Sequence, residues 1–193
     1  SSSISNWIGQ HPVILDELLD PITNFEVEKR STITQDIARK LGDVNSTDLE
    51  RDMDLLREYR WGYNLRVGAA DIAGLLSVRD VSRALSALAE ALVEQALDSA
   101  RNTLIPSLLD IDTTELGIVA YGKLGSGELG YNSDLDIIFV YDQPSSISAS
   151  AAAERRYRLS RLVQRLVHIL TVQTPAGNLY EIDLRLRPDG RSG

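Results

Sequence analysis

Two aspartates separated by a single residue are the part of the sequence best suited to chemistry. Asp134 and Asp136 open an apolar, β-prone segment, DLDIIFVY, at residues 134–141. Because side chains alternate between the two faces of a strand, both carboxylates are predicted to project from the same face. Adjacent carboxylates raise each other's energy, and a bound Mg²⁺, which prefers oxygen ligands, relieves that repulsion. The pair therefore predicts a divalent-cation site, with Mn²⁺ as an alternative ion.

A third carboxylate is expected from a later strand. The segment YEIDLRLR, residues 180–187, alternates apolar and charged residues, which is typical of a half-buried strand. Asp183 lies on its charged face and can complete the metal site if the two strands are neighbours. Two metal ions held by such carboxylates could clamp the attacking and leaving oxygens of an in-line phosphoryl displacement. Arg185 and Arg187 share the face of Asp183 and are predicted to contact phosphate.

A glycine-rich segment precedes the aspartate pair and limits the kind of phosphate site. GSGELG, residues 125–130, matches the dinucleotide pattern GxGxxG, but that site needs a helix directly after the glycines, and here a strand follows. A Walker A loop needs Ser or Thr after its Gly-Lys pair, whereas Leu124 follows Lys123. What remains is a strand ending in Gly, a short loop and a second strand that opens with the aspartates. This arrangement predicts phosphoryl-transfer chemistry, with Lys123 as a further phosphate contact.

The elements that must position these residues follow from hydrophobic periodicity. Apolar residues recur at three- and four-residue spacing from Trp7 to Arg101, with helices predicted at 48–63 and from about 78 to 104. After Pro106 the pattern changes to short β-prone runs, the first of which is LGIVAY at residues 116–121.

The second half continues with a loop, a helix and a strand. Residues 143–153 have the Ser- and Ala-rich composition of a mobile loop. An amphipathic helix follows, with an apolar stripe from Leu159 to Leu170, and the strand at 180–187 comes last. The order strand, loop, strand, helix, strand predicts an α/β or α+β half with a small sheet.

The composition excludes several other kinds of site. The chain has no Cys, so a disulfide framework and a thiolate metal site are both excluded. Its two histidines, His11 and His168, do not lie in a zinc-binding spacing, and His168 is predicted to pack beside Ile169. Any metal must therefore be held by oxygen ligands.

The formal net charge of -8 is unevenly distributed along the chain. Residues 1–116 carry 11 Lys and Arg against 20 Asp and Glu, whereas residues 117–193 carry 9 against 8. Coating of nucleic acid needs a basic excess over a broad face, so we predict no nucleic-acid partner. No apolar run approaches the roughly 18 residues of a membrane span, and the first residues lack a signal-peptide pattern. We therefore predict a soluble, cytoplasmic protein that does not contact a membrane.

These motifs resemble the glutamine synthetase adenylyltransferase family, within the DNA polymerase beta-like nucleotidyltransferases. The similar segments are GKLGSGELGYNSDLDIIFVYD and LYEIDLRLRPDGRSG, and the match extends upstream to cover about residues 50–193. The resemblance implies an α+β fold in which a helical region, 1–105, precedes a small mixed-sheet nucleotidyltransferase core, 106–193. Because the family continues into further helices, we expect a fragment truncated at its C-terminal end.

The resemblance also implies roles for the carboxylates. Asp134 and Asp136 would bind Mg²⁺, and Asp183 would complete the metal set or assist deprotonation of the acceptor. A tyrosine hydroxyl of glutamine synthetase would attack the α-phosphorus of ATP and release pyrophosphate. A PII-type signalling protein is implied as a regulator of this reaction.

The nucleotide contacts depend on which glycine ends the first strand. Superfamily members usually carry Gly-Ser there. Gly125 and Ser126 have those letters but leave only seven residues before Asp134, whereas Gly122 and Lys123 leave ten. We prefer the second register on spacing, with Lys123 in place of the usual serine. The full set of predicted nucleotide-binding residues is Gly122, Lys123, Gly125, Ser126, Ser133, Arg185 and Arg187.

The direction of the reaction rests on the resemblance alone. The family carries two related halves, one attaching AMP and one removing it by phosphorolysis. ELGY before SDLD, with AYGKLG ahead of it, resembles the attaching half, so we predict adenylylation. Removal of AMP with release of ADP is one alternative. A non-catalytic module that binds nucleotide or a regulator is the other, and it would bind its ligand without Mg²⁺.

Overall fold

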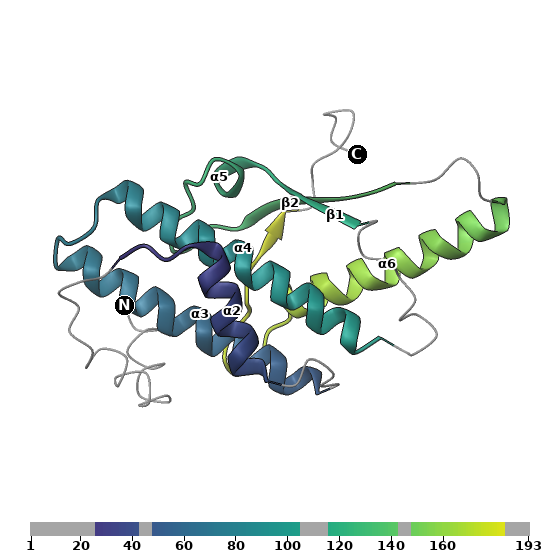
Figure 1. Ribbon diagram of the computed structural model, residues 1–193, viewed down its shortest axis with the longest axis horizontal. Helices are drawn as coiled ribbons and strands as arrows, with labels where there is room; N and C mark the ends of the chain where they lie inside the picture. The colour runs from purple at the N-terminus through teal and green to yellow at the C-terminus, as the bar shows by residue number, and fades with distance from the viewer. Residues whose placement is uncertain (1–25, 43–47, 105–115, 143–147, 184–193) are drawn as a thin grey trace.

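The computed structural model describes residues 26–42, 48–104, 116–142 and 148–183, and its long helices pack around one central helix (Figure 1). This central helix, α4, contacts each of the other three long helices. The four are α2 (Arg30–Leu41), α3 (Leu49–Ile72), α4 (Val78–Asn102) and α6 (Ala149–Thr171). The helical first half predicted from periodicity is therefore confirmed for the described residues.

The starts of three helices are fixed by polar caps that the sequence supplies. The Asp48 side chain accepts from the amide of Arg51 at the start of α3, and Ser77 accepts from Asp80 at the start of α4. Ser148 accepts from Ala151 in the same way at the start of α6. Each cap satisfies an amide that the first helical turn leaves without an intrahelical partner.

The three strands form one small mixed sheet in the order β1-β2-β3. They are β1 (Leu116–Ala120), β2 (Leu135–Tyr141) and β3 (Ile182–Asp183). β1 pairs antiparallel with β2, whereas β3, reached through α6, pairs parallel with it. The predicted α+β class and the order strand, loop, strand, helix, strand are thus confirmed.

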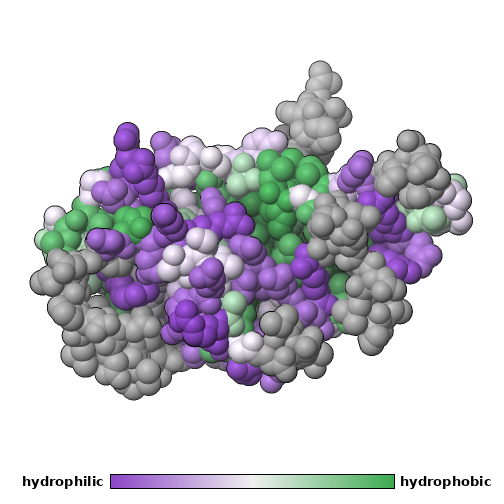
Figure 2. Space-filling model, viewed as in Figure 1, coloured by the Kyte–Doolittle hydropathy of each residue, from purple (hydrophilic) through white to green (hydrophobic). Residues whose placement is uncertain are grey.

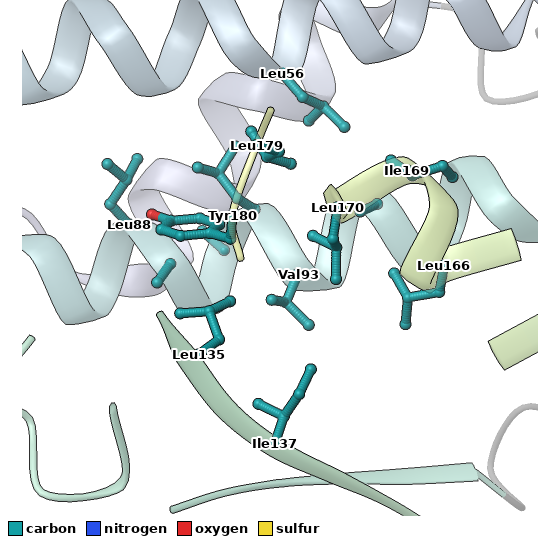
Figure 3. Packing of buried hydrophobic residues seen from close by; sticks show 14 of the residues in the cluster. Leu56, Leu88, Val93, Leu135, Ile137, Leu166, Ile169, Leu170, Leu179 and Tyr180 are labelled. Carbon is teal, nitrogen blue, oxygen red and sulfur yellow. The ribbon is translucent and has the colours of Figure 1, made fainter. Parts of the chain in front are cut away.

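The inner face of the sheet packs on the helices. Leu135 and Ile137 of β2 are almost fully buried and point toward Leu88 and Val93 of α4 and Leu166 of α6 (Figure 3). Burying such side chains stabilises the fold by roughly 1.5–3 kcal/mol each. Side chains from before and after the predicted boundary at residue 105 belong to this one core.

Part of the predicted loop at residues 143–153 is helical. α6 begins at Ala149, so residues 149–153 form its first turn, and residues 143–147 lie outside the described part. The loop prediction was wrong there because the serines and alanines that favoured a loop also supply a helix cap, Ser148, and strong helix formers after it.

Two further predictions need correction. The helix predicted at 48–63 continues to Ile72, because Val67 and Ala70 are fully buried against the rest of the protein despite the nearby glycines. His168 does not pack beside Ile169 but is exposed, since the two point to different sides of α6. His11 lies outside the described residues.

The face of the molecule drawn in Figure 2 carries both polar and hydrophobic areas. Figure 2 shows hydrophobic surface at the end of the molecule where α3 leads into α4, and Ile72, Leu75 and Val78 are exposed there. None of the helices in the described ranges is long and apolar enough to cross a membrane.

Candidate active site

The candidate site lies at the start of β2, where an acidic residue stands on each side of a buried one. Leu135 is fully buried and holds the backbone against the core. Asp134 precedes the strand and is exposed, and Asp136 is half-buried. The predicted pair therefore lies at the edge of the hydrophobic core, where a carboxylate can reach solvent or a ligand.

Asp183 lies beside Asp136 because β3 is the parallel neighbour of β2. The register pairs Leu135 with Ile182 and Asp136 with Asp183, and the Leu135 amide donates to the Glu181 carbonyl at 2.9 Å. Directly paired residues of neighbouring strands project from the same face of a sheet. The condition set from the sequence, that these two strands be neighbours, is met.

Gly122 approaches the carboxylate of Asp136 more closely than any other residue type could. It has a φ of +51°, and a Cβ placed on it would overlap Asp136 Oδ2 and lie 3.0 Å from its Cγ. The preceding amide, that of Tyr121, donates to the Asp136 carbonyl at 2.8 Å. The positive φ of Gly122 and its close contact with the Asp136 carboxylate therefore both require glycine.

The glycine loop, residues 122–133, begins with the short helical turn α5 (Gly122–Gly125). Lys123 is exposed on this turn, and Gly125 packs so tightly that a Cβ on it would lie 2.7 Å from the Ala120 carbonyl. The Ser126 hydroxyl bonds to Glu128 Oε2 at 3.1 Å. Of the two predicted registers, Gly122 of the preferred one lies against Asp136, whereas Gly125 of the other packs on the Ala120 carbonyl.

The end of the glycine loop is attached to the helices. The buried Ser86 hydroxyl of α4 accepts from the Leu129 amide at 3.3 Å, and the Tyr131 hydroxyl donates to Asp71 of α3 at 3.2 Å. Burial, together with the charge of Asp71, raises the pKa of Tyr131 to about 12. Ser133, a predicted nucleotide contact, accepts from the Gly130 amide at 3.0 Å and so closes a turn within the loop.

The β3 approach, residues 172–181, is attached to α3 by residues that sequence reasoning missed. The Arg57 side chain is fully buried and donates to the Gly177 carbonyl at 2.7 Å. Arg60 lies over the Tyr180 ring at 4.4 Å from its centroid, and Trp61 Nε1 donates to the Ala176 carbonyl at 3.3 Å. The only indication of this role in the sequence was Arg57 itself, an arginine four residues after Met53 on the apolar stripe of a helix. Arginine is also common on solvated helix faces, so the position was not distinctive.

The donors at the site suit a hard cation by their chemistry. All are carboxylate oxygens, the ligands that Mg²⁺ prefers, and Asp136 is half-buried with Gly122 packed against its carboxylate. Among the described residues no Lys or Arg forms an ion pair with Asp134 or Asp136. Within the same ranges no three acidic or histidine side chains converge tightly enough to form a metal site. Arg185 and Arg187 lie outside the described residues.

The whole chain is similar to known proteins. A family model described as glutamate-ammonia ligase adenylyltransferase matches residues 1–193.

Individual relatives show the same similarity. A protein of Idiomarina loihiensis named bifunctional glutamine synthetase adenylyltransferase/adenylyl-removing enzyme is 38% identical over 98% of this chain. Proteins of the same name from Shewanella oneidensis and Vibrio parahaemolyticus are 36% and 38% identical over 98% and 100% of it. The chain spans 21% of the length of each of these curated relatives.

Proposed function

The chain belongs to the glutamate-ammonia ligase adenylyltransferase family, and from this premise we propose that it carries the site that transfers AMP from ATP to a tyrosine hydroxyl of glutamine synthetase. The observation that carries the proposal is the pairing of Asp136 with Asp183 across β2 and β3, next to Gly122. It supplies two carboxylates on one face and an adjoining glycine turn, as nucleotidyl transfer requires.

The proposed reaction is a single displacement at phosphorus. The tyrosine oxygen forms a bond to the α-phosphorus of ATP, the bond from that phosphorus to the β-phosphate bridging oxygen breaks, and pyrophosphate leaves. The hydroxyl proton passes to a carboxylate or to solvent. Asp183 is the proposed acceptor or metal ligand, because it projects from the same face as Asp136 and lies on the next strand.

Asp134, Asp136 and Asp183 are proposed to hold Mg²⁺, with Mn²⁺ as a substitute. The bound ion would lower the pKa of the attacking hydroxyl and stabilise charge on the leaving group. The protein's own contribution is to hold two of these carboxylates, Asp136 and Asp183, at paired positions of adjacent strands next to the buried Leu135.

The phosphates are proposed to lie along the glycine loop. Gly122 brings the backbone of α5 against Asp136, and the exposed Lys123 beside it can approach a phosphate oxygen. The remaining proposed contacts are Gly125, Ser126, Ser133, Arg185 and Arg187.

The proposal extends to regulation and location only through the family. We propose glutamine synthetase as the protein substrate, a PII-type signalling protein as the regulator, and the cytoplasm as the compartment. Regulation of glutamine synthetase by adenylylation would link this chain to nitrogen metabolism.

The proposal is tested by transfer of label from α-labelled ATP to glutamine synthetase, in the full natural protein. Asp136→Asn should lower the rate by about a hundredfold or more, because metal stabilisation of the transition state contributes several kcal/mol. Asp142→Asn is the matched control, since it makes the same change at an exposed position just after the other end of β2. Its rate should equal that of the unmodified protein.

Equal rates in Asp136→Asn and Asp142→Asn would overturn the proposed site.

Product analysis separates the two directions of the family's chemistry, attachment and removal of AMP. Release of ADP from adenylylated glutamine synthetase in the presence of phosphate, without transfer from ATP, would assign this chain to removal of AMP instead.

A further inference from the structure

We propose that Arg57 is a positioning residue that sets the register of β3, and through it the place of Asp183 beside Asp136. Arg57 lies on α3, far along the chain from both aspartates, and its side chain is fully buried. The inference rests on the proposed function, because it gives Arg57 a role in metal-dependent transfer through Asp183.

Among the described residues the guanidinium of Arg57 bonds only to backbone carbonyls, and these come from three places. Nη1 donates to the Met53 carbonyl of its own helix at 2.8 Å. Nη2 donates to the carbonyls of Ile169 and Val172, at the end of α6, at 3.2 and 2.8 Å. Nε donates to the Gly177 carbonyl at 2.7 Å. One side chain therefore joins α3, the end of α6 and the turn that follows it.

The positive charge of Arg57 is balanced by these carbonyls. No described carboxylate forms an ion pair with it. The C-terminal end of a helix carries a partial negative charge and leaves its last carbonyls without intrahelical partners. A buried cation there balances the charge and also donates hydrogen bonds to the carbonyls. Removing the guanidinium would take away the donor to the carbonyls of Ile169 and Val172, which is costly at a buried helix end, whereas the Gly177 carbonyl would keep its bond from the Thr174 amide at 3.0 Å.

The contacts continue from the end of α6 to Asp183. The amides of Leu179 and Tyr180 both donate to the Leu170 carbonyl, at 3.1 and 2.8 Å. The next residue, Glu181, accepts from Leu135 of β2, and the pairing of Asp183 with Asp136 follows. A shift of the α6 end or of the turn at Gly177 would therefore move Asp183 along β2.

A lysine cannot replace this set of bonds. Arg presents its donors in a rigid planar fork, whereas Lys concentrates its donors at one point on a flexible stem. Arg57→Lys keeps the charge and a similar length but cannot reach carbonyls on three segments at once. The Arg57→Lys variant therefore tests the arrangement of the hydrogen-bond donors separately from the positive charge.

The experiment compares Arg57→Lys with Leu56→Ala in the full natural protein. Leu56 is the preceding residue of α3 and is fully buried, so its truncation lowers stability but removes no hydrogen-bond donor from the carbonyls of the β3 approach. Two quantities are measured below the melting temperature of both variants: the Mg²⁺ or Mn²⁺ concentration for half-maximal transfer, and amide hydrogen exchange in residues 178–183. Arg57→Lys should raise the metal concentration about tenfold, as losses of supporting contacts around metal ligands do.

The proposal is supported if Arg57→Lys both speeds amide exchange in residues 178–183 and raises the metal concentration for half-maximal transfer. Leu56→Ala should leave that metal concentration unchanged and should not speed exchange in residues 178–183 more than elsewhere. Unchanged exchange in Arg57→Lys overturns it, as does the same shift in metal requirement in both variants. Failure of the proposed function has a different result: Asp136→Asn would then transfer AMP normally, whatever Arg57→Lys does to exchange.

Discussion

The glycine loop and the β3 approach both bring residues to the start of β2, but they are held in different ways. The glycine loop is held at its end by two neutral donors, the Leu129 amide and the Tyr131 hydroxyl, and every residue of its first turn except Leu124 is exposed. The β3 approach is held by a fully buried guanidinium and by the buried side chains of Leu179 and Tyr180.

This difference separates the proposed ligand contacts from the residues that hold the site in place. The glycine loop carries an exposed lysine, Lys123, and a glycine, Gly122, against the Asp136 carboxylate. The β3 approach carries no predicted ligand contact before Asp183 and is fixed to the core instead. Three changes in the glycine loop and its supports would test this difference, in order of decreasing effect.

The largest effect is expected at Gly122. Gly122→Ala places a Cβ against Asp136 Oδ2, so the carboxylate must move, and misplacement of about 1 Å at an active site can cost about a hundredfold in rate. Gly127→Ala is the matched control, because Gly127 also has a positive φ, +70°, but a Cβ there meets nothing within 4 Å. Transfer rates and melting temperatures are measured for both variants.

Both alanine variants should lose about 1–2 kcal/mol of stability from the left-handed backbone, and only Gly122→Ala should lose activity. If Gly127→Ala lost as much activity as Gly122→Ala, backbone strain rather than contact with Asp136 would explain the effect. Activity would then depend on the backbone conformation of the whole glycine loop. The loop would have a structural role like that of the β3 approach, and the difference between the two regions would disappear.

An intermediate effect is expected at Ser86. Ser86→Ala removes the acceptor of the buried Leu129 amide and should lower the free energy of unfolding by about 1–3 kcal/mol. Ser82→Ala, one turn earlier on α4, should change it by no more than about 0.5 kcal/mol. Urea denaturation measures both. Equal losses in the two variants would show that the bond to Leu129 does not hold the loop.

The smallest effect is expected at Tyr131 and depends on pH. The pKa of its hydroxyl is raised in the folded protein from 10.0 to about 12, first by burial and then by Asp71. The contribution of the neutral hydroxyl is therefore fully present below pH 10 and is lost as the pH rises toward 12. The stability advantage of the unmodified protein over Tyr131→Phe should shrink across that interval, as followed by thermal unfolding at pH 8 and pH 11.5. A constant difference would place Tyr131 in solvent.

Much of the architecture could be predicted from local patterns. The α4 and α6 stripes, the apolar strand segments and the aspartate spacing lie within short windows, and the structure follows them. The later strand was predicted, and the condition that it lie beside β2 is met, since Asp183 pairs with Asp136. The loop at 143–153 was misjudged because Ser and Ala occur both in loops and at helix starts, and only the packing of α6 decides between them.

The sequence by itself determined which residue types could do chemistry here: carboxylates and a glycine turn, with no Cys and no zinc-type histidines. Only the tertiary structure decided which of them meet. Gly122 rather than Gly125 lies against Asp136. Arg57 contacts the β3 approach at Gly177, which lies 120 residues further along the chain. The physical reason is that side-chain chemistry is local to a residue, whereas contact depends on how the helices and sheet share one core.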